Sequence, residues 1–313
     1  MRAILHIGRH KSGTSSLQHF MAGNRDFLAG QGIVYPRAGS RNGIAHHLLA
    51  AECNHNLSDG NGLPAMVEAL RDQTSGFDTV LLSSEAFQNL TRLDRLEGVL
   101  AALGVTERRI FCYVREHVDY AVSAFRQYVH RQVDFVTFDD FTARLGAMDV
   151  FVTRWQQFGD LSIHWYDRKR LHKGDIVEDF LCRAGLPSSH ATRLAMNPSI
   201  GGNLLFFKLA ANHAGREFLH YNTLSRLAAE HREFKAPFRI TDARATALRA
   251  ASRYNATLAE HLGTPPEVRS WEAERALPDP DRLEDDLDRI AALETDADFA
   301  WIRTRLETAA DWF

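Results

Sequence analysis

The segment from Gly8 to Ser16 contains the residue types that bind a phosphate-like anion. It reads Gly-Arg-His-Lys-Ser-Gly-Thr-Ser-Ser, directly after the apolar run 3–7 and directly before a helical pattern. A loop of this kind between a strand and a helix directs backbone N–H groups at one point, where the helix dipole adds partial positive charge. Lys11 adds a full positive charge within the loop. The segment therefore predicts an anion-binding loop.

The position of the lysine distinguishes this loop from that of a nucleotide kinase. A kinase loop follows the pattern Gly-x4-Gly-Lys-[Ser/Thr], with its lysine directly after the second glycine. Gly8 and Gly13 have this spacing, but Thr14 occupies the lysine position and Lys11 lies upstream of it. The loop is therefore a variant, and the rest of the chain must indicate which anion it binds.

A second pair of candidate anion ligands follows an apolar, β-branched and aromatic run at 109–114, which predicts a buried strand. The run ends at Arg115, and the next segment has one apolar stripe with helical spacing, formed by Val118, Val122, Phe125 and Val129. Ser123 lies on this predicted helix. Ligands of α/β proteins bind outside the carboxyl ends of the strands, so we expect Arg115 and Ser123 to converge on one anion.

The two predicted sites together resemble those of sulfotransferases that use 3′-phosphoadenosine 5′-phosphosulfate (PAPS). The segment Lys11-Ser12-Gly13-Thr14-Ser15 is similar to the 5′-phosphosulfate loop of this family. Arg115 and Ser123, eight positions apart, are similar to the arginine and serine that hold the 3′-phosphate. The chain thus resembles this family, in particular a bacterial-like cytosolic member of it.

The resemblance is strongest over residues 1–35 and 80–130, extends more loosely to about residue 186, and has no specific match beyond about residue 200. Two positions depart from the family pattern. His117 stands where the family usually has a proline two residues after the arginine. Ser16 stands where the family often has an aromatic residue that stacks on the nucleotide.

The resemblance implies in-line transfer of a sulfuryl group from PAPS to a hydroxyl or amine, which leaves 3′-phosphoadenosine 5′-phosphate. Lys11 would neutralise the charge that develops on the bridging oxygen. The 5′-phosphate would be held by Lys11, Ser12, Gly13, Thr14, Ser15 and Ser16. The runs 79–84 and 109–115 lack the aspartate that holds magnesium in kinases. We therefore expect sulfuryl rather than phosphoryl transfer, with no metal ion.

A hydroxyl or amine acceptor needs a base that removes its proton in the transition state. Glu85 follows the apolar strand pattern 79–82 through two serines, so its carboxylate is expected at the sheet edge where the loop also opens. The sulfotransferase base, a histidine or a glutamate, commonly lies near this place. His46 and His47, at the start of a predicted short helix, are the alternative bases.

Two other functions remain open at this point. One is a nucleotide or small-molecule kinase on the same scaffold, which would consume ATP with magnesium. The other is a non-catalytic nucleotide-binding protein that retains the loop without turnover. The acceptor of a transferase stays open among carbohydrates, lipid-linked sugars, small phenols and peptide tyrosine, because acceptor pockets lie in variable loops and in the C-terminal helices. A small-molecule, carbohydrate or glycolipid acceptor is the expectation for a cytoplasmic chain.

The elements that must position these residues form an α/β pattern. Predicted helices alternate with predicted strands at 3–7, 33–35, 79–83, 109–114 and 161–166. This alternation predicts a three-layer fold, a parallel sheet with helices on both faces, similar to P-loop nucleotide kinases. We expect an α/β core over 1–196 and a helical portion over 197–313 that packs on the core as part of the same domain. The predicted junction is at 195–199, where Asn-Pro marks a turn.

Composition excludes several classes of protein. A formal net charge of −3 over 313 residues argues against a broadly basic nucleic-acid binder. Three widely spaced cysteines without a Cys-x-x-Cys pair predict neither a disulfide framework nor a zinc site. No apolar run approaches the roughly 20 residues that cross a bilayer. The chain enters its first strand almost at once, so we expect no signal peptide and a cytoplasmic protein.

Overall fold

The computed structural model of the chain describes residues 1–55, 62–145, 149–187, 199–236, 238, 240–266, 277–293 and 299–313. The chain forms two compact units. The sheet unit comprises Met1–Arg115, Met148–Met196 and Ala256–Pro266, and the helical unit comprises Glu116–Ala147, Asn197–Asn255 and Glu267–Phe313. The predicted domain boundary at 196/197 and the predicted junction up to residue 198 lie outside the described residues.

The sheet unit contains a five-stranded, all-parallel sheet in the order β2-β3-β1-β4-β5. Its strands are β1 (Arg2–His6), β2 (Ile33–Val34), β3 (Thr79–Ser83), β4 (Glu107–Val114) and β5 (Asp160–Trp165). Each lies at or within a few residues of a predicted strand. Mainly apolar runs form the central strands β1 and β3 and the second half of β4, because a parallel sheet is buried on both faces, whereas the edge strand β5 mixes polar and apolar residues. The predicted α/β class with a parallel sheet is therefore confirmed.

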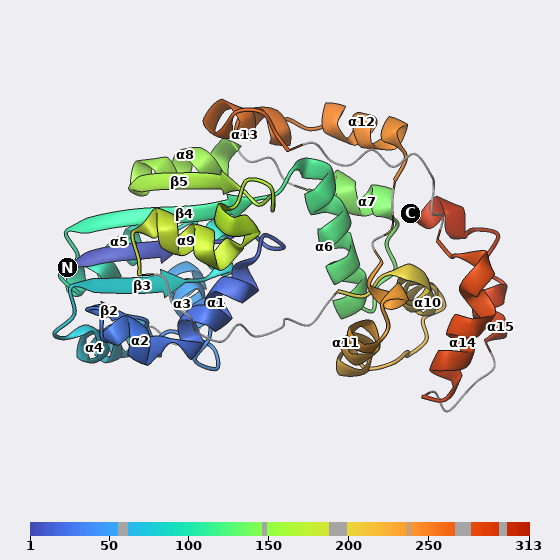
Figure 1. Ribbon diagram of the computed structural model, residues 1–313, viewed down its shortest axis with the longest axis horizontal. Coiled ribbons are helices and arrows are strands. Elements are labelled where there is room, and N and C mark those ends of the chain that lie inside the picture. Colours follow the sequence, from blue (N-terminus) through green and yellow to red (C-terminus); the bar gives the residue numbers. More distant parts are fainter. Residues whose placement is uncertain are drawn as a thin grey trace. The chain divides into compact units, whose positions relative to one another are not determined.

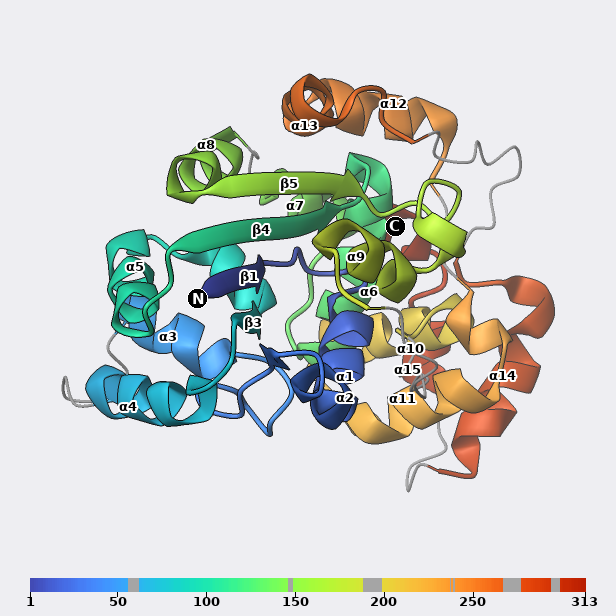
Figure 2. The same cartoon turned by 60° about the vertical axis from the view of Figure 1, so that its left-hand side comes forward.

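Helices cover both faces of this sheet (Figure 1). On one face, α1 (Thr14–Gly23), α2 (Arg25–Ala29) and α9 (Ile176–Ala184) pack on strand residues such as Ile4 and Phe111. Figure 2 shows α1 and α9 side by side, and the two helices are in contact. The remaining helices include α3 (His47–His55), α4 (Gly62–Thr74) and α5 (Leu93–Ala102), which contact one another, and α8 (Asp149–Phe158), which contacts β5.

The strand order determines where a ligand can bind in the sheet unit. After β1 the chain continues to β2 at one edge of the sheet, whereas after β3 it passes to β4 on the other side of β1. The connections that leave β1 and β3 therefore run in opposite directions. In open α/β sheets, a crevice for ligands lies at such a reversal, outside the carboxyl ends of the strands. Three segments begin there: the loop after β1, η1 (Glu85–Asn89) after β3, and Arg115 after β4.

The helical unit is built around an apolar core. Its longer helices are α6 (His117–Arg131), α10 (Gly202–His213), α11 (Tyr221–Glu230), α12 (Asp242–Ala250) and α14 (Leu283–Ala291). Shorter elements are α7 (Phe138–Ala143), η3 (Glu233–Lys235), η4 (Pro280–Arg282), α15 (Ala300–Arg303) and η5 (Ala309–Trp312). Aromatic side chains from α6, α7 and α10 share this core, including Phe125, Phe138 and Phe206. The described residues after 200 are therefore mainly helical, as predicted.

One long helix expected in this part of the chain is divided. The pattern 243–261 predicts a single helix, but α12 ends at Ala250 and α13 (Tyr254–Leu262) begins after a short turn. The hydroxyl of Ser252 accepts a hydrogen bond from the backbone N–H of Tyr254 at 3.0 Å. Serine competes for backbone N–H groups in this way and so starts a new helix. The pattern 283–308 likewise predicts one helix, but α14 ends at Ala291, and residues 294–298 lie outside the described part of the chain.

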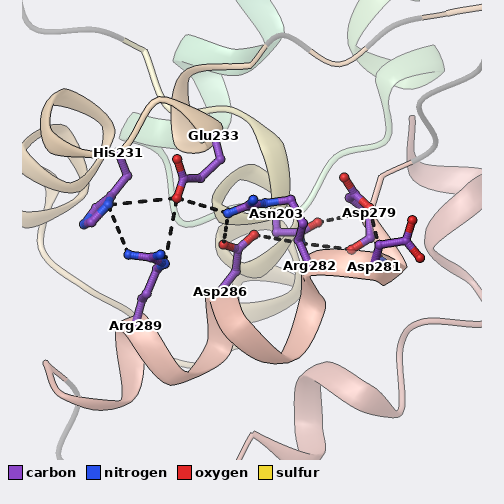
Figure 3. A network of polar contacts seen from close by, with 8 residues as sticks. All are labelled: Asn203, His231, Glu233, Asp279, Asp281, Arg282, Asp286 and Arg289. Carbon is purple, nitrogen blue, oxygen red and sulfur yellow. Dashed lines mark hydrogen bonds and ion pairs between the residues drawn. The ribbon is translucent and has the colours of Figure 1, made fainter.

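A polar network connects α10, η3 and α14 within the helical unit (Figure 3). Asp286 is 1% exposed and accepts hydrogen bonds from Asn203 at 3.0 Å and from Arg282 at 3.2 Å. Arg282 also donates to Glu233 at 3.1 Å. Burial raises the pKa of Asp286 although the Arg282 guanidinium acts in the opposite direction. The buried Asp286 carboxylate and Arg282, which lies in η4, therefore link α10, η3 and α14.

Two further observations concern the described residues only. None of the helices in that part of the chain has both the length and the apolar character needed to cross a membrane. The same residues contain no cluster of three or more histidine, cysteine, aspartate or glutamate side chains able to hold a metal ion.

Candidate active site

The loop after β1 has a backbone conformation that requires glycine. Gly8, Lys11 and Gly13 all have positive φ angles, of 51°, 66° and 79°. A Cβ atom at Gly8 would lie 2.6 Å from Cγ2 of Thr14, and one at Gly13 would lie 2.6 Å from Cε2 of Tyr166. These distances leave no room for a side chain, so both glycines are needed for the turn that joins β1 to α1.

The start of α1 faces this turn with backbone N–H groups. Gly13 is the N-cap residue, and no side chain caps the helix there. Ser12 is fully buried, and its Oγ has no hydrogen-bond partner among the described residues. A buried hydroxyl without a partner is costly. Ser12 and the first turn of α1 thus form a polar cradle that an anion with several acceptor oxygens would fit.

Arg115 lies against this loop, as the two predicted anion sites require. Its Nε donates a hydrogen bond to the carbonyl oxygen of Lys11. Its guanidinium stacks over the ring of Tyr166, 4.6 Å from the ring centre. The structure therefore brings Arg115 and the loop together within the sheet unit. Ser123 lies on α6, in the helical unit, and its convergence with Arg115 stays a prediction.

Glu85 is the first residue after Ser84, which caps η1 at the end of β3. Its side chain is 18% exposed, and its Oε2 accepts a hydrogen bond from Gln18 on α1 at 2.7 Å. Nε2 of His47 lies 3.6 Å from the same oxygen, and Nδ1 of His10 lies 4.0 Å from Oε1. Burial opposes ionisation, but the Gln18 hydrogen bond and the two histidines hold the pKa of Glu85 below its usual value. The carboxylate is therefore ionised at neutral pH and able to accept a proton.

The two candidate histidines have different environments. His46 is fully buried, accepts the backbone N–H of Ser83 at Nδ1 and lies 3.0 Å from the carbonyl of Pro36 through Nε2. Burial lowers the pKa of His46 to about 4. Both of its ring nitrogens are used in linking β3 to the segment after β2, so His46 acts as a structural residue. His47 is 30% exposed and faces Glu85.

Sequence reasoning did not identify Gln18, Ser84 or Tyr166 as site residues. Gln18 lies one helical turn after Thr14, so the two share a face of α1, and this spacing is a signal that the sequence contains. Tyr166 directly follows β5, at the same carboxyl edge as Arg115. Its contacts with Gly13 and Arg115 depend on how β5 lies beside β4, which no local pattern specifies.

A cavity of ≈ 200 Å³ lies beside the loop in the sheet unit. Its lining includes Ser16 from the predicted loop, together with Tyr166, Arg168 and Ile176. The cavity therefore has an aromatic ring, an aliphatic side chain and polar groups next to the anion cradle.

Comparisons of the chain with protein-family models, curated proteins and solved structures found no match.

Proposed function

We propose that the chain is a P-loop-type sulfotransferase that moves a sulfuryl group from PAPS to a hydroxyl or amine acceptor. One observation carries this proposal: the loop after β1, Arg115 after β4 and Glu85 after β3 meet at one edge of the sheet. Anion-binding groups and an ionised carboxylate therefore face the same crevice. This is the combination that in-line transfer to a protonated acceptor requires.

The loop supplies the groups for the 5′-phosphate. The Ser12 hydroxyl, the backbone N–H groups of Thr14, Ser15 and Ser16, and the dipole of α1 would hold its oxygens. Lys11 would neutralise the bridging oxygen, and the contact between its carbonyl and Arg115 supports the loop in this conformation. When bound, PAPS supplies the sulfuryl group, which passes to the acceptor as its bond to the 5′-phosphate breaks.

Glu85 is the proposed base. The acceptor's O–H or N–H bond breaks as the oxygen or nitrogen bonds to sulfur, and the proton passes to the carboxylate. Gln18 and the two nearby histidines keep this group ionised in the resting protein. Such proton removal typically contributes 10²–10⁴-fold to the rate.

The cavity beside Ser16 is the part of the sheet unit that we assign to the adenine ring. Tyr166 offers an aromatic ring and Ile176 an aliphatic side chain for contact with a purine, and the cavity adjoins the loop. Ser16 in place of an aromatic residue would then leave room for the ring instead of stacking on it.

The testing experiment compares ligands and then activity. Thermal unfolding is measured with 3′-phosphoadenosine 5′-phosphate, with adenosine 5′-phosphate and with ATP plus magnesium, because a ligand of the native state raises its apparent stability. The first should stabilise the protein most. Transfer from PAPS is then measured on a panel of phenols, carbohydrates and glycolipids. Binding without transfer would indicate a non-catalytic nucleotide-binding protein, and magnesium-dependent ATP consumption would indicate a kinase.

Two variants test the predicted 3′-phosphate ligands. Arg115→Leu and Ser123→Ala should each weaken binding of the 3′-phosphorylated nucleotide, by roughly 10-fold or more for the arginine, since hydrogen bonds to charged groups contribute about 1.5–3 kcal/mol. Binding of adenosine 5′-phosphate should change little in Ser123→Ala. In Arg115→Leu it should fall as well, but by less than binding of the 3′-phosphorylated nucleotide, because Arg115 also donates to the Lys11 carbonyl in the 5′-phosphate loop. Arg109→Leu is the matched control, because Arg109 lies nearer the other end of β4 and donates to the carbonyls of Arg183 and Ala184. Equal losses for both nucleotides would contradict a 3′-phosphate site.

A further inference from the structure

Glu85 presents two different oxygens, and the difference suggests how the base is oriented. Oε2 accepts the Gln18 hydrogen bond at 2.7 Å and faces Nε2 of His47 at 3.6 Å. Oε1 faces the loop, where His10 lies 4.0 Å away. We propose that Gln18, His47 and Ser84 are positioning residues that hold Oε2 of Glu85, so that Oε1 is the atom that takes the acceptor's proton. This inference rests on the proposed function.

Gln18 is a fixed donor. It lies on α1, is 3% exposed, and its side-chain N–H₂ group donates to Oε2. The helix on which it lies begins at the anion loop, at Thr14. The same helix therefore supplies the backbone N–H groups of the anion cradle and the side-chain donor to Glu85. Because α1 is one rigid element, it fixes the distance between the anion cradle and the Glu85 carboxylate.

Ser84 determines which nitrogen of His47 carries a proton. The Ser84 hydroxyl is fully buried, accepts the backbone N–H of Ala86 at 3.1 Å and lies 2.7 Å from Nδ1 of His47. A buried hydroxyl hydrogen needs an acceptor, and Nδ1 is the acceptor at hydrogen-bond distance. Ser84 then donates to Nδ1, which leaves the proton of the neutral ring on Nε2. Nε2 lies 3.6 Å from Oε2, and a positive N–H hydrogen near that oxygen favours the ionised carboxylate.

The result is a carboxylate with one committed and one available oxygen. With Oε2 near both Gln18 and His47, rotation of the carboxyl group would break a short hydrogen bond, so Oε1 remains on the side of the loop, 4.0 Å from His10. The acceptor's proton passes to Oε1 while its oxygen or nitrogen forms the new bond to sulfur. Holding the base in this way raises the rate by keeping Oε1 in the productive orientation, since a 1 Å displacement of a catalytic group can lower the rate about a hundredfold.

Within the described part of the chain, four titratable groups from different segments interact electrostatically with Glu85. They are His6 on β1, His10 in the loop, Tyr35 after β2 and His47 on α3. Burial keeps His6 and Tyr35 uncharged at neutral pH, with the pKa of His6 lowered to about 4 and the pKa of Tyr35 raised. Of the groups acting on the carboxylate, Gln18 is uncharged at every pH, so its removal changes the titration of Glu85 without adding another ionisation.

The first experiment replaces Gln18 by leucine and, separately, by the more adaptable methionine. The carboxyl titration of Glu85 is followed by ¹³C nuclear magnetic resonance in the free protein, and kcat is followed against pH. Loss of the hydrogen bond should move both the titration and the acid limb of the rate profile to higher pH, with kcat at neutral pH reduced about tenfold or more. Gln88→Leu is the matched control: Gln88 is also buried near Glu85, but its amide oxygen contacts Arg9. It should leave the acid limb in place.

The second experiment addresses Ser84 and His47. Imidazole ¹⁵N shifts should show the Nε2–H form of His47 in the native protein and a loss of that preference in Ser84→Ala, with recovery in Ser84→Thr. His47→Leu should lower kcat while the KM for the nucleotide stays unchanged. A native His47 protonated at Nδ1 would overturn the proposal, as would an unshifted Glu85 titration in folded Gln18 variants.

The two proposals fail in different ways. If no acceptor is sulfated, the proposed function is wrong, whereas the Glu85 titration and the His47 tautomer still decide whether the carboxylate is held as described. If transfer occurs and the Gln18 variants keep the native pH profile, the function stands and the positioning role is wrong.

Discussion

Replacement of Gly13 by alanine tests the geometry on which the anion loop depends. Gly13 has a φ of 79°, and an added Cβ would lie 2.6 Å from Cε2 of Tyr166 and 3.0 Å from Cγ1 of Ile176. A left-handed backbone costs a residue with a Cβ about 1–2 kcal/mol. Overpacking of a filled site typically costs about 1–3 kcal/mol. The lower flexibility of the unfolded chain returns about 0.4–1 kcal/mol.

We therefore expect Gly13→Ala to lower the free energy of unfolding of the sheet unit by roughly 2–4 kcal/mol. The matched control is Gly23→Ala at the other end of the same helix. An added Cβ at Gly23 meets nothing within 4 Å. Alanine favours a helix over glycine by about 0.5–1 kcal/mol, so this variant should be as stable as the native protein or slightly more stable.

The measurement is urea unfolding followed by far-ultraviolet circular dichroism, with binding of 3′-phosphoadenosine 5′-phosphate measured in parallel. Gly13→Ala should unfold at a lower urea concentration and bind the nucleotide weakly, while Gly23→Ala should match the native protein in binding. A Gly13→Ala variant as stable as Gly23→Ala would refute the loop conformation described above.

Three other variants test separate parts of the structure. Lys11→Met should reduce transfer from PAPS by about 10²–10³-fold in a protein that unfolds at the native urea concentration, as expected for loss of one charge-stabilising group. His6 and His46 are fully buried with pKa values lowered to about 4, so each binds no proton in the native state between about pH 6.5 and 4 while the unfolded chain does. The contribution of each histidine to the free energy of unfolding should therefore be fully present above pH 6.5, and about 3 kcal/mol of it should be lost per histidine as the pH decreases to 4. His46→Gln should unfold with a weaker pH dependence than the native protein, and an equal dependence would contradict its buried neutral state. Asp286→Ala should lower the free energy of unfolding of the helical unit by about 2 kcal/mol, because it leaves one N–H of the buried Asn203 amide without an acceptor, whereas Asp288→Ala, on the exposed face of the same helix, should have little effect.

The sheet and its loop were predictable because local patterns determine them. The run 3–7 is apolar on both faces of a strand, and Gly8 and Gly13 have the spacing of a phosphate loop. Strand alternation with helices then implies a parallel sheet. The position of Glu85 at the carboxyl edge also followed from local sequence, since two serines separate it from the apolar run of β3.

The partners of these residues were less predictable because they come from distant segments. His46 and His47 are adjacent and looked equivalent in the sequence. In the structure one ring is enclosed between Pro36 and Ser83, and the other faces Glu85. Which of the two rings faces Glu85 depends on how the start of α3 packs against the end of β3. This tertiary contact has no signature in the local sequence.

The contacts of Tyr166 and Arg115 link loop geometry to chemistry. Lys11 has a positive φ, which a residue with a side chain adopts only when its surroundings impose it. The Lys11 carbonyl accepts a hydrogen bond from Arg115, and the Arg115 guanidinium stacks on the ring of Tyr166, the same ring that leaves no room for a side chain at Gly13. We therefore expect a substitution of Tyr166 to shift Arg115 and, through it, the backbone that positions the Lys11 amine. The conformation of the lysine is a property of the ends of β4 and β5 as much as of the loop that contains it.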